Sequence, residues 1–336
     1  METIDWKNLG FGYMKTDYNI RSYYRDGAWS PLQVTDSEYI DLHMAATCLH
    51  YGQEAFEGLK AFRGKDGKIR IFRPEENAKR MSATAEYIRM AAPPVEMFVD
   101  AVKQAVKANE RFIPPYGTGA SLYIRPLLFG SGAQVGVKPA TEYVFIVFVT
   151  PVGPYFKEGF KPIKVIIDRY RDRAAPKGTG HIKMGGNYAA SLKSGEWAHD
   201  LGYASVLYLD PKENRYIDEC GPANFFAIRA GSYITPDSPS ILPSITNMSL
   251  RQLAQDMGLK VESRKIALDE VPTFDEAGCC GTAAVISPIG SIYDPEMNMT
   301  YAFGDEPGPW CLKLYEALRS IQYGDHPDPY NWVTVL

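Results

Sequence analysis

Strand-like runs recur along the whole chain, and helical runs interrupt them at irregular intervals. The segment 68–72, KIRIF, alternates apolar and polar residues, as a half-buried strand does. The segments 121–130 and 141–151 contain the β-branched and aromatic residues that favour strands. A regular alternation of strand and helix would indicate a doubly wound parallel sheet, whereas this irregular order predicts an α+β fold.

Three helical runs have recognisable features. The first begins at Pro74, which is favourable in a first turn, and two glutamates follow it near the positive end of the helix dipole. The segments 246–258 and 310–324 carry apolar residues at helical spacing. Further strands are expected at 164–168, 206–210, 216–220, 225–231, 265–271 and 284–290.

A Pro- and Gly-rich segment suggests where the chain divides. Residues 151–162 contain three Pro and two Gly, a composition typical of a linker. The length of 336 residues suits two domains. We therefore expect a small N-terminal α/β domain at 1–150, an interdomain linker at 151–162 and a larger C-terminal domain at 163–336.

Composition excludes several classes of function. The net charge is −4, from 36 basic and 40 acidic residues, and no polybasic run suits a nucleic-acid backbone or an anionic membrane. No apolar run approaches the roughly 20 residues of a membrane span. The start, METIDWKNLG, lacks the basic and apolar regions of a secretory signal. The five cysteines include no CxxC pair, so neither a zinc site nor a disulfide scaffold is indicated, and we expect a cytoplasmic protein without a metal.

Lys183 is the first candidate for chemistry. It lies in GTGHIKMGGNYAAS, where four glycines allow close approach of the backbone or sharp turns. Its neighbours Met184 and Tyr188 are uncharged, so partial desolvation would lower the pKa of its ammonium group and suit Schiff-base chemistry. A solvated loop lysine is the alternative interpretation. A nucleotide phosphate loop is another, but neither GxxxxGK[ST] nor GxGxxG after a strand is present.

Three weaker signals indicate an anion site. The amides of Ile245 and Thr246 would lie at the N-terminus of the helix expected there. A turn at 281–283 would offer further amides and one hydroxyl, and Arg80 could make a bidentate contact with phosphate. Each signal is common in proteins by itself.

Carboxylate and carboxylate-binding side chains complete the candidates. Glu219 ends an expected strand and is either a carboxylate facing water or one buried opposite a protonated ring nitrogen. Tyr123 and Arg125 are two residues apart on a strand and so share a face. This pair is either a receptor for a substrate carboxylate or a surface stack.

Taken together, several motifs resemble the branched-chain amino acid aminotransferases, which are pyridoxal-phosphate enzymes of fold type IV. The resemblance runs from about residue 40 to 325 in motif order and spacing. It rests on YGQEAFEGLKAFR, RPEENAKRM, SLYIRP, TPVGPYF, KMGGNYAAS, ECGPANFF, ILPSIT and CGTAAVISP. It implies a two-domain fold like that of D-amino acid aminotransferase, with a small α/β domain and a larger, β-barrel-like domain that binds the cofactor.

The resemblance also implies roles for individual residues. Pyridoxal 5′-phosphate would form a Schiff base with Lys183, Glu219 would pair with its ring nitrogen, and Tyr188 would contact its phenolic oxygen. The phosphate would be held by Arg80, Ile245, Thr246 and Thr282. The substrate would contact Tyr51, Phe56, Gly58, Tyr123, Arg125, Tyr155, Thr282, Ala283 and, across a homodimer interface, Val137.

The implied reaction is a reversible ping-pong transfer of the amino group of L-leucine, L-isoleucine or L-valine to 2-oxoglutarate, which gives L-glutamate. The same pocket must therefore accept an apolar side chain and a γ-carboxylate. Two enzymes of the same fold, D-amino acid aminotransferase and aminodeoxychorismate lyase, are alternatives with different carboxylate receptors. A non-catalytic cofactor-binding protein and a nucleotide-dependent enzyme are alternatives from other classes.

Overall fold

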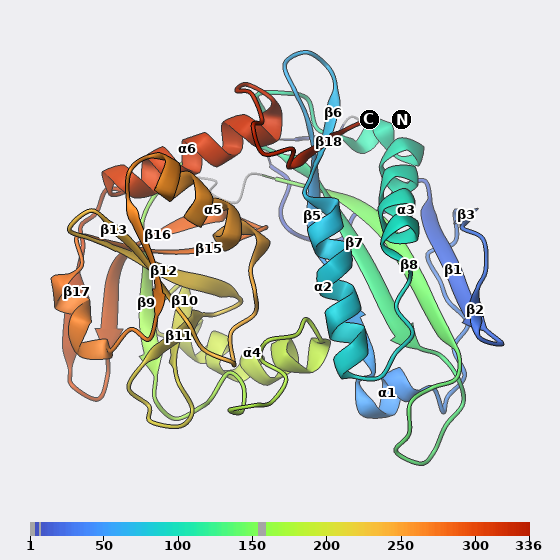
Figure 1. Cartoon of the computed structure of the whole chain (residues 1–336), viewed down its shortest axis with the longest axis horizontal. Helices are drawn as coiled ribbons and strands as arrows, with labels where there is room; N and C mark the ends of the chain where they lie inside the picture. The colour runs from blue at the N-terminus through green and yellow to red at the C-terminus, as the bar shows by residue number, and fades with distance from the viewer. Residues whose placement is uncertain (1–3, 7, 154–158) are drawn as a thin grey trace. The chain divides into compact units, whose positions relative to one another are not determined.

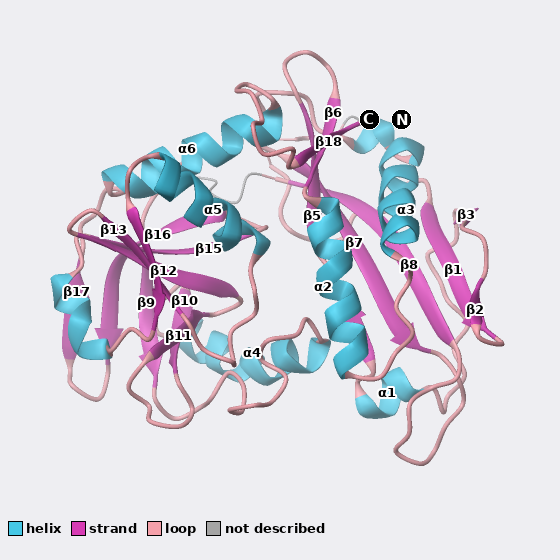
Figure 2. Cartoon of the chain, viewed as in Figure 1, coloured by secondary structure: helices cyan, strands magenta, loops and turns pink. Residues whose placement is uncertain are grey.

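The computed structural model describes residues 4–6, 8–153 and 159–336. Contacts within the chain divide it into two compact units. Unit 1 comprises Met1–Tyr155, Ile182–Gly185 and Ser320–Leu336, and unit 2 comprises Phe156–His181 and Gly186–Arg319. Both units combine helices with a sheet (Figure 2), as the predicted α+β class requires.

The sheet of unit 1 has nine strands within the described residues, and their pairings are antiparallel. The order is β18-β6-β5-β7-β8-β1-β2, with β3 beside β1 and β4 beside β7. The strands are β1 (Asn19–Arg25), β2 (Ala28–Trp29), β3 (Gln33–Thr35), β4 (Glu54–Phe56), β5 (Leu59–Arg63), β6 (Ile69–Phe72), β7 (Ser121–Gly130), β8 (Tyr143–Val152) and β18 (Val333–Val335). The strands predicted at 68–72, 121–130 and 141–151 are confirmed.

Two helices, α2 (Pro74–Tyr87) and α3 (Val95–Ala108), cover one face of this sheet (Figure 1). Pro74 begins α2 and Glu75 and Glu76 occupy its first turn, as predicted. A short helix, α1 (Thr47–Tyr51), precedes β4, and a 3₁₀ turn, η1 (Glu110–Phe112), follows α3. The core of the unit lies between helices and sheet and includes Met81, Phe98 and Phe145.

The sheet of unit 2 also has nine strands within the described residues, in the order β11-β10-β9-β16-β15-β12-β13-β14, with β17 beside β16. They are β9 (Ile163–Asp168), β10 (Ser205–Leu209), β11 (Ile217–Cys220), β12 (Ala223–Arg229), β13 (Ser232–Pro236), β14 (Lys260–Arg264), β15 (Glu276–Gly281), β16 (Val285–Asp294) and β17 (Met299–Ala302). Because β11 pairs with both β10 and β12, the strands from β11 to β12 close into a barrel.

Three helices accompany the barrel: α4 (Gly185–Asp200), α5 (Ile245–Asp256) and α6 (Pro309–Tyr323). Helix α4 packs through Ala198 on β9 and β10, and α5 packs on β14 and β15. A second apolar core contains residues of the barrel strands such as Ile167, Leu207 and Phe225. Helices α5 and α6 confirm the predictions at 246–258 and 310–324.

One predicted strand is wrong. Residues 265–271 were expected to form a strand, but the structure has a 3₁₀ helix, η2 (Leu268–Thr273), in the second half of this segment. Glu270 accepts a hydrogen bond from the Ala267 amide at 3.0 Å, and Pro272 cannot donate within a strand ladder. The strand of this region is β14, which ends at Arg264.

The units also differ from the expected domain boundaries. Ser320–Leu336 belongs to unit 1 because β18 pairs with β6, and Ile182–Gly185 belongs to unit 1 although it falls in the expected C-terminal domain. Strand β8 continues to Val152, into the expected linker, whose residues 154–158 lie outside the described part of the chain.

A buried asparagine fastens the N-terminal segment to unit 1. Asn109 is fully buried, and its Oδ1 accepts the amides of Asp17 and Tyr18 at 2.9 and 3.0 Å. Its Nδ2 donates to the carbonyls of Tyr18 and Ala105, both at 2.8 Å. One side chain therefore satisfies backbone groups of two segments.

Replacing Asn109 should destabilise the fold measurably. Asn109→Ala leaves buried amides and carbonyls without partners, so we expect the free energy of unfolding to fall by roughly 2–4 kcal/mol. The exposed Lys107→Ala, on the same helix, is the matched control in urea unfolding and should change little. Equal stability of the two variants would contradict this role of Asn109.

Candidate active site

Lys183 is fixed to unit 1 through its backbone. Its amide donates to Thr84 Oγ1 on α2 at 3.0 Å, and its carbonyl accepts from the amide of Phe56 on β4 at 3.2 Å. Two residues on, the Gly185 amide donates to the Glu54 carboxylate. A Cβ at position 185 would lie 2.0 Å from Glu54 Oε1, so this close approach requires glycine.

The surroundings of Glu54 shift the pKa of its carboxyl. Burial raises the pKa of its carboxyl, while the Gly185 amide and the charge of Arg125 act in the opposite direction. Glu54 therefore links the segment that carries Lys183 to the surroundings of Arg125.

A single aromatic ring lies beside both Lys183 and Arg125. Lys183 Nζ is 4.8 Å from the centroid of the Phe56 ring, and Arg125 Cζ is also 4.8 Å from it. Arg125 Nη2 donates to the Tyr123 hydroxyl at 3.1 Å, so these two side chains share a face of β7 as predicted. Among the described residues, the buried Arg125 Nε has no hydrogen-bond partner.

Gly58 makes room for Tyr123. A Cβ at Gly58 would lie 2.2 Å from the Tyr123 hydroxyl oxygen, so a side chain at this position would displace the Tyr123 ring. Three of the predicted substrate residues, Phe56, Tyr123 and Arg125, belong to paired strands of one sheet, and Gly58 lies between its strands β4 and β5.

Arg80 is held by a buried carboxylate. Glu57 is fully buried, and Arg80 donates Nε to Glu57 Oε1 at 2.8 Å and Nη2 to Glu57 Oε2 at 2.7 Å. Asn77 Nδ2 also donates to Glu57 Oε2 at 2.7 Å. This bidentate pair fixes the plane of the guanidinium on α2.

Two further predicted substrate residues are Val137, which lies on a loop, and Tyr51, which forms a hydrogen bond to that loop. The Tyr51 hydroxyl donates to the Val135 carbonyl, and the Gln134 amide donates to the Ala45 carbonyl at 2.9 Å. Val137 is 84% exposed on this loop. Tyr155, also predicted to contact substrate, lies outside the described residues.

In unit 2, Glu219 is buried on β11, with two hydrogen-bond donors at one carboxylate oxygen and a cation at the other. Oε1 accepts from Asn224 Nδ2 at 2.9 Å and from the Leu242 amide at 3.0 Å. Oε2 forms an ion pair with Arg173 Nε. Glu219 is 1% exposed, so the interpretation as a strand-end carboxylate facing water is wrong.

A chain of side-chain hydrogen bonds connects Glu219 to helix α5. Asn224 Oδ1 accepts from Asn247 Nδ2 at 3.2 Å, and Asn247 Oδ1 accepts from the Tyr233 hydroxyl at 2.8 Å. Asn247 lies in the first turn of α5, and its amide donates to the N-cap side chain of Ser244 at 3.2 Å.

The predicted phosphate amides lie where helix and turn were expected. Helix α5 begins at Ile245, so the amides of Ile245 and Thr246 precede the first intrahelical hydrogen bonds. Thr282 and Ala283 form the turn between β15 and β16, and β15 packs on α5. Tyr188 is half-buried in the first turn of α4.

The cysteines next to this turn are inert thiols. Cys279 and Cys280 are buried, and a hydrogen bond with Cys220 together with burial raises the pKa of Cys279. Burial likewise raises the pKa of Cys280. Neither is a thiolate near neutral pH, so neither is a nucleophile in this state.

Three positioning side chains were not predicted from the sequence. The Phe11 ring packs edge-on against Tyr123, with centroids 5.0 Å apart, and Glu57 and Arg173 hold Arg80 and Glu219. A charged Glu57 inside the apolar run AFEGLKAF was a usable signal, because a buried carboxylate needs a cationic partner. Phe11 and Arg173 are far from their partners in sequence.

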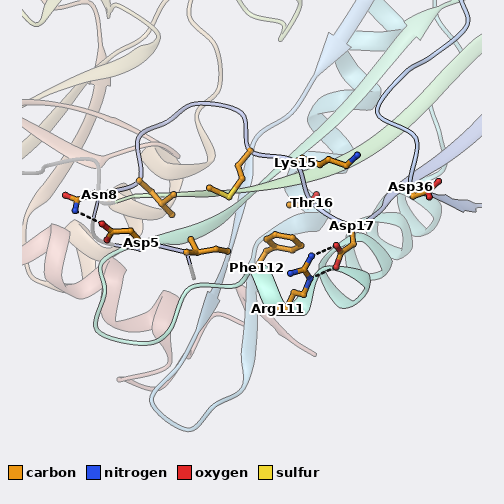
Figure 3. Close-up of a pocket in the computed structure, with 11 residues that line it drawn as sticks. Asp5, Asn8, Lys15, Thr16, Asp17, Asp36, Arg111 and Phe112 are labelled. Atoms are coloured by element: carbon orange, nitrogen blue, oxygen red, sulfur yellow. Dashed lines mark hydrogen bonds and ion pairs between the residues drawn. The ribbon is translucent and has the colours of Figure 1, made fainter. Parts of the chain in front are cut away.

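A pocket of about 730 Å³ occurs elsewhere in unit 1 (Figure 3). No predicted site residue lines it, and its polar groups bond to one another, as Arg111 does to Asp17 and Asn8 to Asp5 at 2.7 Å. Its lining residues are Ile4, Asp5, Asn8, Leu9, Met14, Lys15, Thr16, Asp17, Asp36, Arg111 and Phe112.

The donor sets of the two units fit the parts of pyridoxal phosphate. Unit 2 offers first-turn amides for a phosphate and a buried carboxylate for a protonated ring nitrogen, and the partnerless Arg125 Nε in unit 1 suits a substrate carboxylate. Within the described residues, no cluster of three metal-ligating side chains occurs, and no helix is long and apolar enough to span a membrane.

Comparison with known proteins identifies close relatives. The family described as "Amino-transferase class IV" matches residues 54–292. The branched-chain-amino-acid aminotransferase of Haemophilus influenzae is 47% identical over 340 residues, covering 99% of each chain.

Two solved structures of branched-chain amino acid aminotransferases are also similar to this chain. The branched-chain amino acid aminotransferase of Escherichia coli has a TM-score of 0.79 at 27% identity and covers 95% of this chain and 99% of its own. That of Thermobaculum terrenum, solved in its PLP form, has a TM-score of 0.77 at 27% identity, over 96% and 98% of the two chains.

Asp218, beside Glu219, should make stability depend on pH. Burial raises the pKa of its carboxyl from 3.8 to about 6, so the folded state binds this proton more tightly than the unfolded state. The free energy of unfolding therefore falls by roughly 3 kcal/mol as pH rises from about 4 through 6, because Asp218 loses this tightly bound proton.

Asp218→Asn should remove that loss and make unfolding free energies less dependent on pH between about 4 and 6. The exposed Asp237→Asn is the control and should retain the wild-type slope in urea titrations at each pH. An unchanged slope in Asp218→Asn would show that this carboxyl is already ionised at acidic pH.

Proposed function

The chain belongs to the class IV aminotransferases, as a branched-chain amino acid aminotransferase of fold type IV, and we propose that Lys183 and Glu219 carry its chemistry. It is a pyridoxal-phosphate-dependent enzyme. Its substrates are L-leucine, L-isoleucine and L-valine, whose amino group passes to 2-oxoglutarate in a reversible ping-pong cycle.

The observation that carries the proposed site is the pair of cations beside the Phe56 ring. Glutamate presents a Cα proton and, at the end of its side chain, a γ-carboxylate, and here the Lys183 amine and the Arg125 guanidinium lie at equal distances from one ring.

The bound cofactor and the residues of the chain would each carry out a different part of the reaction. Bound pyridoxal phosphate supplies an electron sink for the negative charge that develops at the substrate Cα. Lys183 Nζ would hold the cofactor at rest and would take up the Cα proton of the substrate. Glu219 would accept a hydrogen bond from the ring nitrogen, and Tyr188 would contact the phenolic oxygen.

The phosphate would bind to amides, a hydroxyl and one guanidinium. Ile245 and Thr246 offer helix N-terminal amides, and Thr282 a turn amide and a hydroxyl. Arg80 presents a guanidinium whose orientation Glu57 has already fixed, so little side-chain entropy is lost on binding.

One pocket would serve both half-reactions. Phe56 and Tyr123 form an apolar wall that gains about 0.8 kcal/mol for each methylene a leucine side chain buries. Arg125 receives the γ-carboxylate of glutamate, and keeps the Tyr123 hydroxyl as a partner when an aliphatic side chain is bound. The turn at Thr282 and Ala283 presents amides to the α-carboxylate. Tyr51 and Tyr155 complete the proposed pocket.

We further propose that two copies of the chain associate through an exposed apolar surface of unit 1. This surface comprises Tyr39, Met44, Leu49, Val135 and Val137, which are 61–84% exposed. Hydrogen bonds from Gln134 to Ala45 and from Tyr51 to Val135 hold the loop that carries Val135 and Val137 beside the segment that carries Met44 and Leu49. Large exposed apolar side chains on neighbouring segments indicate a protein partner, and Val137 would then contact substrate in the partner subunit. Free cysteines suit a cytoplasmic location.

A substrate assay tests the proposed function. The purified protein should transfer the amino group of L-leucine to 2-oxoglutarate, and Lys183→Ala should lose this activity together with the visible absorbance of the bound cofactor. Lys177→Ala, in the same segment and exposed, should retain both. Turnover of D-alanine instead of L-leucine, or normal turnover by Lys183→Ala, would falsify the proposal.

A charge in the exposed surface should prevent dimer formation. Met44→Glu places an unpaired carboxylate where the second copy would bury it, so we expect the sedimentation coefficient to fall to that of a monomer. Met297→Glu, 61% exposed in unit 2, is the control and should sediment as the wild type does. A monomeric wild-type protein at micromolar concentration would contradict this interface.

A further inference from the structure

Arg173 is the cationic partner of Glu219, and its own position is tightly determined. It lies on the segment between β9 and α4, and its side chain is 9% exposed. Its Nη1 donates to the Ser240 carbonyl at 2.9 Å, and Nη1 and Nη2 donate to the Gly180 carbonyl at 3.3 Å. The Nε atom forms the ion pair with Glu219 Oε2.

The close packing around these carbonyls fixes the guanidinium. A Cβ at Gly180 would lie 2.1 Å from the Ser240 carbonyl oxygen, so the two backbones that accept from Arg173 are in contact at this point. The guanidinium therefore cannot move from Glu219 without breaking bonds to both segments. A cation that only neutralised the charge of Glu219 would not need to be held so rigidly.

We propose that Arg173 is a positioning residue that keeps Glu219 in its anionic form, so that the proton shared with the cofactor resides on the ring nitrogen. This inference rests on the proposed function, since it assumes that Glu219 faces that nitrogen. Arg173 does not contact the reacting atoms and acts through Glu219.

The electrostatic argument compares two places for one proton. The proton lies either on the ring nitrogen, beside a carboxylate anion, or on Glu219, beside a neutral ring. A guanidinium in direct contact with the carboxylate stabilises the anion more than it destabilises a cation beyond it, because Coulomb energy falls with distance. Arg173 therefore favours the protonated ring, which is the stronger electron sink.

The other polar groups described around Glu219 do not supply the positive charge that stabilises its anion. Asn224 and the Leu242 amide are neutral donors, and burial raises the pKa of the neighbouring Cys280 thiol so that it stays neutral. Asp218, adjacent in sequence, is an acid that also feels the charge of Arg173. Of these groups, only Arg173 is a cation.

The test measures directly whether the ring nitrogen of the cofactor is protonated. Holoenzyme is prepared with pyridoxal phosphate carrying ¹⁵N in the ring, and its ¹⁵N chemical shift is measured at one pH for wild type, Arg173→Gln and Arg173→Lys. Arg171→Gln is the control, because Arg171 lies on the same segment but pairs with Asp168 at 2.8 Å. The set is repeated in the Asp218→Asn background to exclude an effect through that carboxyl.

We expect protonated-ring shifts in wild type, Arg171→Gln and Arg173→Lys, and a shift toward the unprotonated value in Arg173→Gln. The kcat of Arg173→Gln with L-leucine should fall about tenfold or more, as a change of one pKa unit implies, with KM little changed. An unchanged ¹⁵N shift in Arg173→Gln would overturn the inference and leave Arg173 a purely structural residue.

The design also separates three further outcomes. If Arg173→Gln does not fold, Arg173→Lys decides, because an unprotonated ring in that folded, charged variant contradicts the role of the charge. If wild type binds pyridoxal phosphate but the ring is unprotonated, the inference fails. If wild type neither binds the cofactor nor transfers the amino group of L-leucine, the proposed function itself fails.

Discussion

In each unit, a buried carboxylate paired with an arginine supplies one group of the proposed site. In unit 1, Glu57 orients Arg80, the cation offered to a phosphate. In unit 2, Arg173 orients Glu219, the anion offered to a protonated ring nitrogen. Burying a charge without a partner costs several kcal/mol, so each ligand-binding group is held by the partner that its burial requires.

Backbone groups of the site segments take part directly in positioning the remaining groups. Lys183 is placed by the hydrogen bonds of its own peptide to Thr84 and Phe56. The phosphate amides follow from the start of α5 and from the turn between β15 and β16. The asparagine network that joins Glu219 to α5 fixes the carboxylate relative to these amides within one unit. Rigid elements rather than mobile loops therefore hold most of the proposed cofactor residues.

Local sequence patterns predicted the elements that form through local interactions. Pro74 with two following glutamates predicted α2, and β-branched runs predicted β7 and β8. Helix α4 was not predicted, because Gly185 and Gly186 begin it and its buried residues Asn187, Ser194 and Ala198 form no apolar stripe. The pairing of β18 with β6 and the contact of Arg173 with Glu219 join distant positions, and no spacing rule contains them. The proposed site residues came from local sequence signals together with the motif resemblance, whereas the contact of Arg173 with Glu219 is seen only in the fold.

The central claim is that Lys183, Glu219 and the amides of α5 serve one pyridoxal phosphate molecule. A crystal structure of the protein with pyridoxal phosphate and an unreactive leucine analogue tests it most directly. The account predicts continuous density from Lys183 Nζ to the cofactor, its phosphate at Ile245, Thr246 and Thr282, and its ring nitrogen at Glu219. Attachment to another lysine, or a ring nitrogen that faces away from Glu219, would contradict the account.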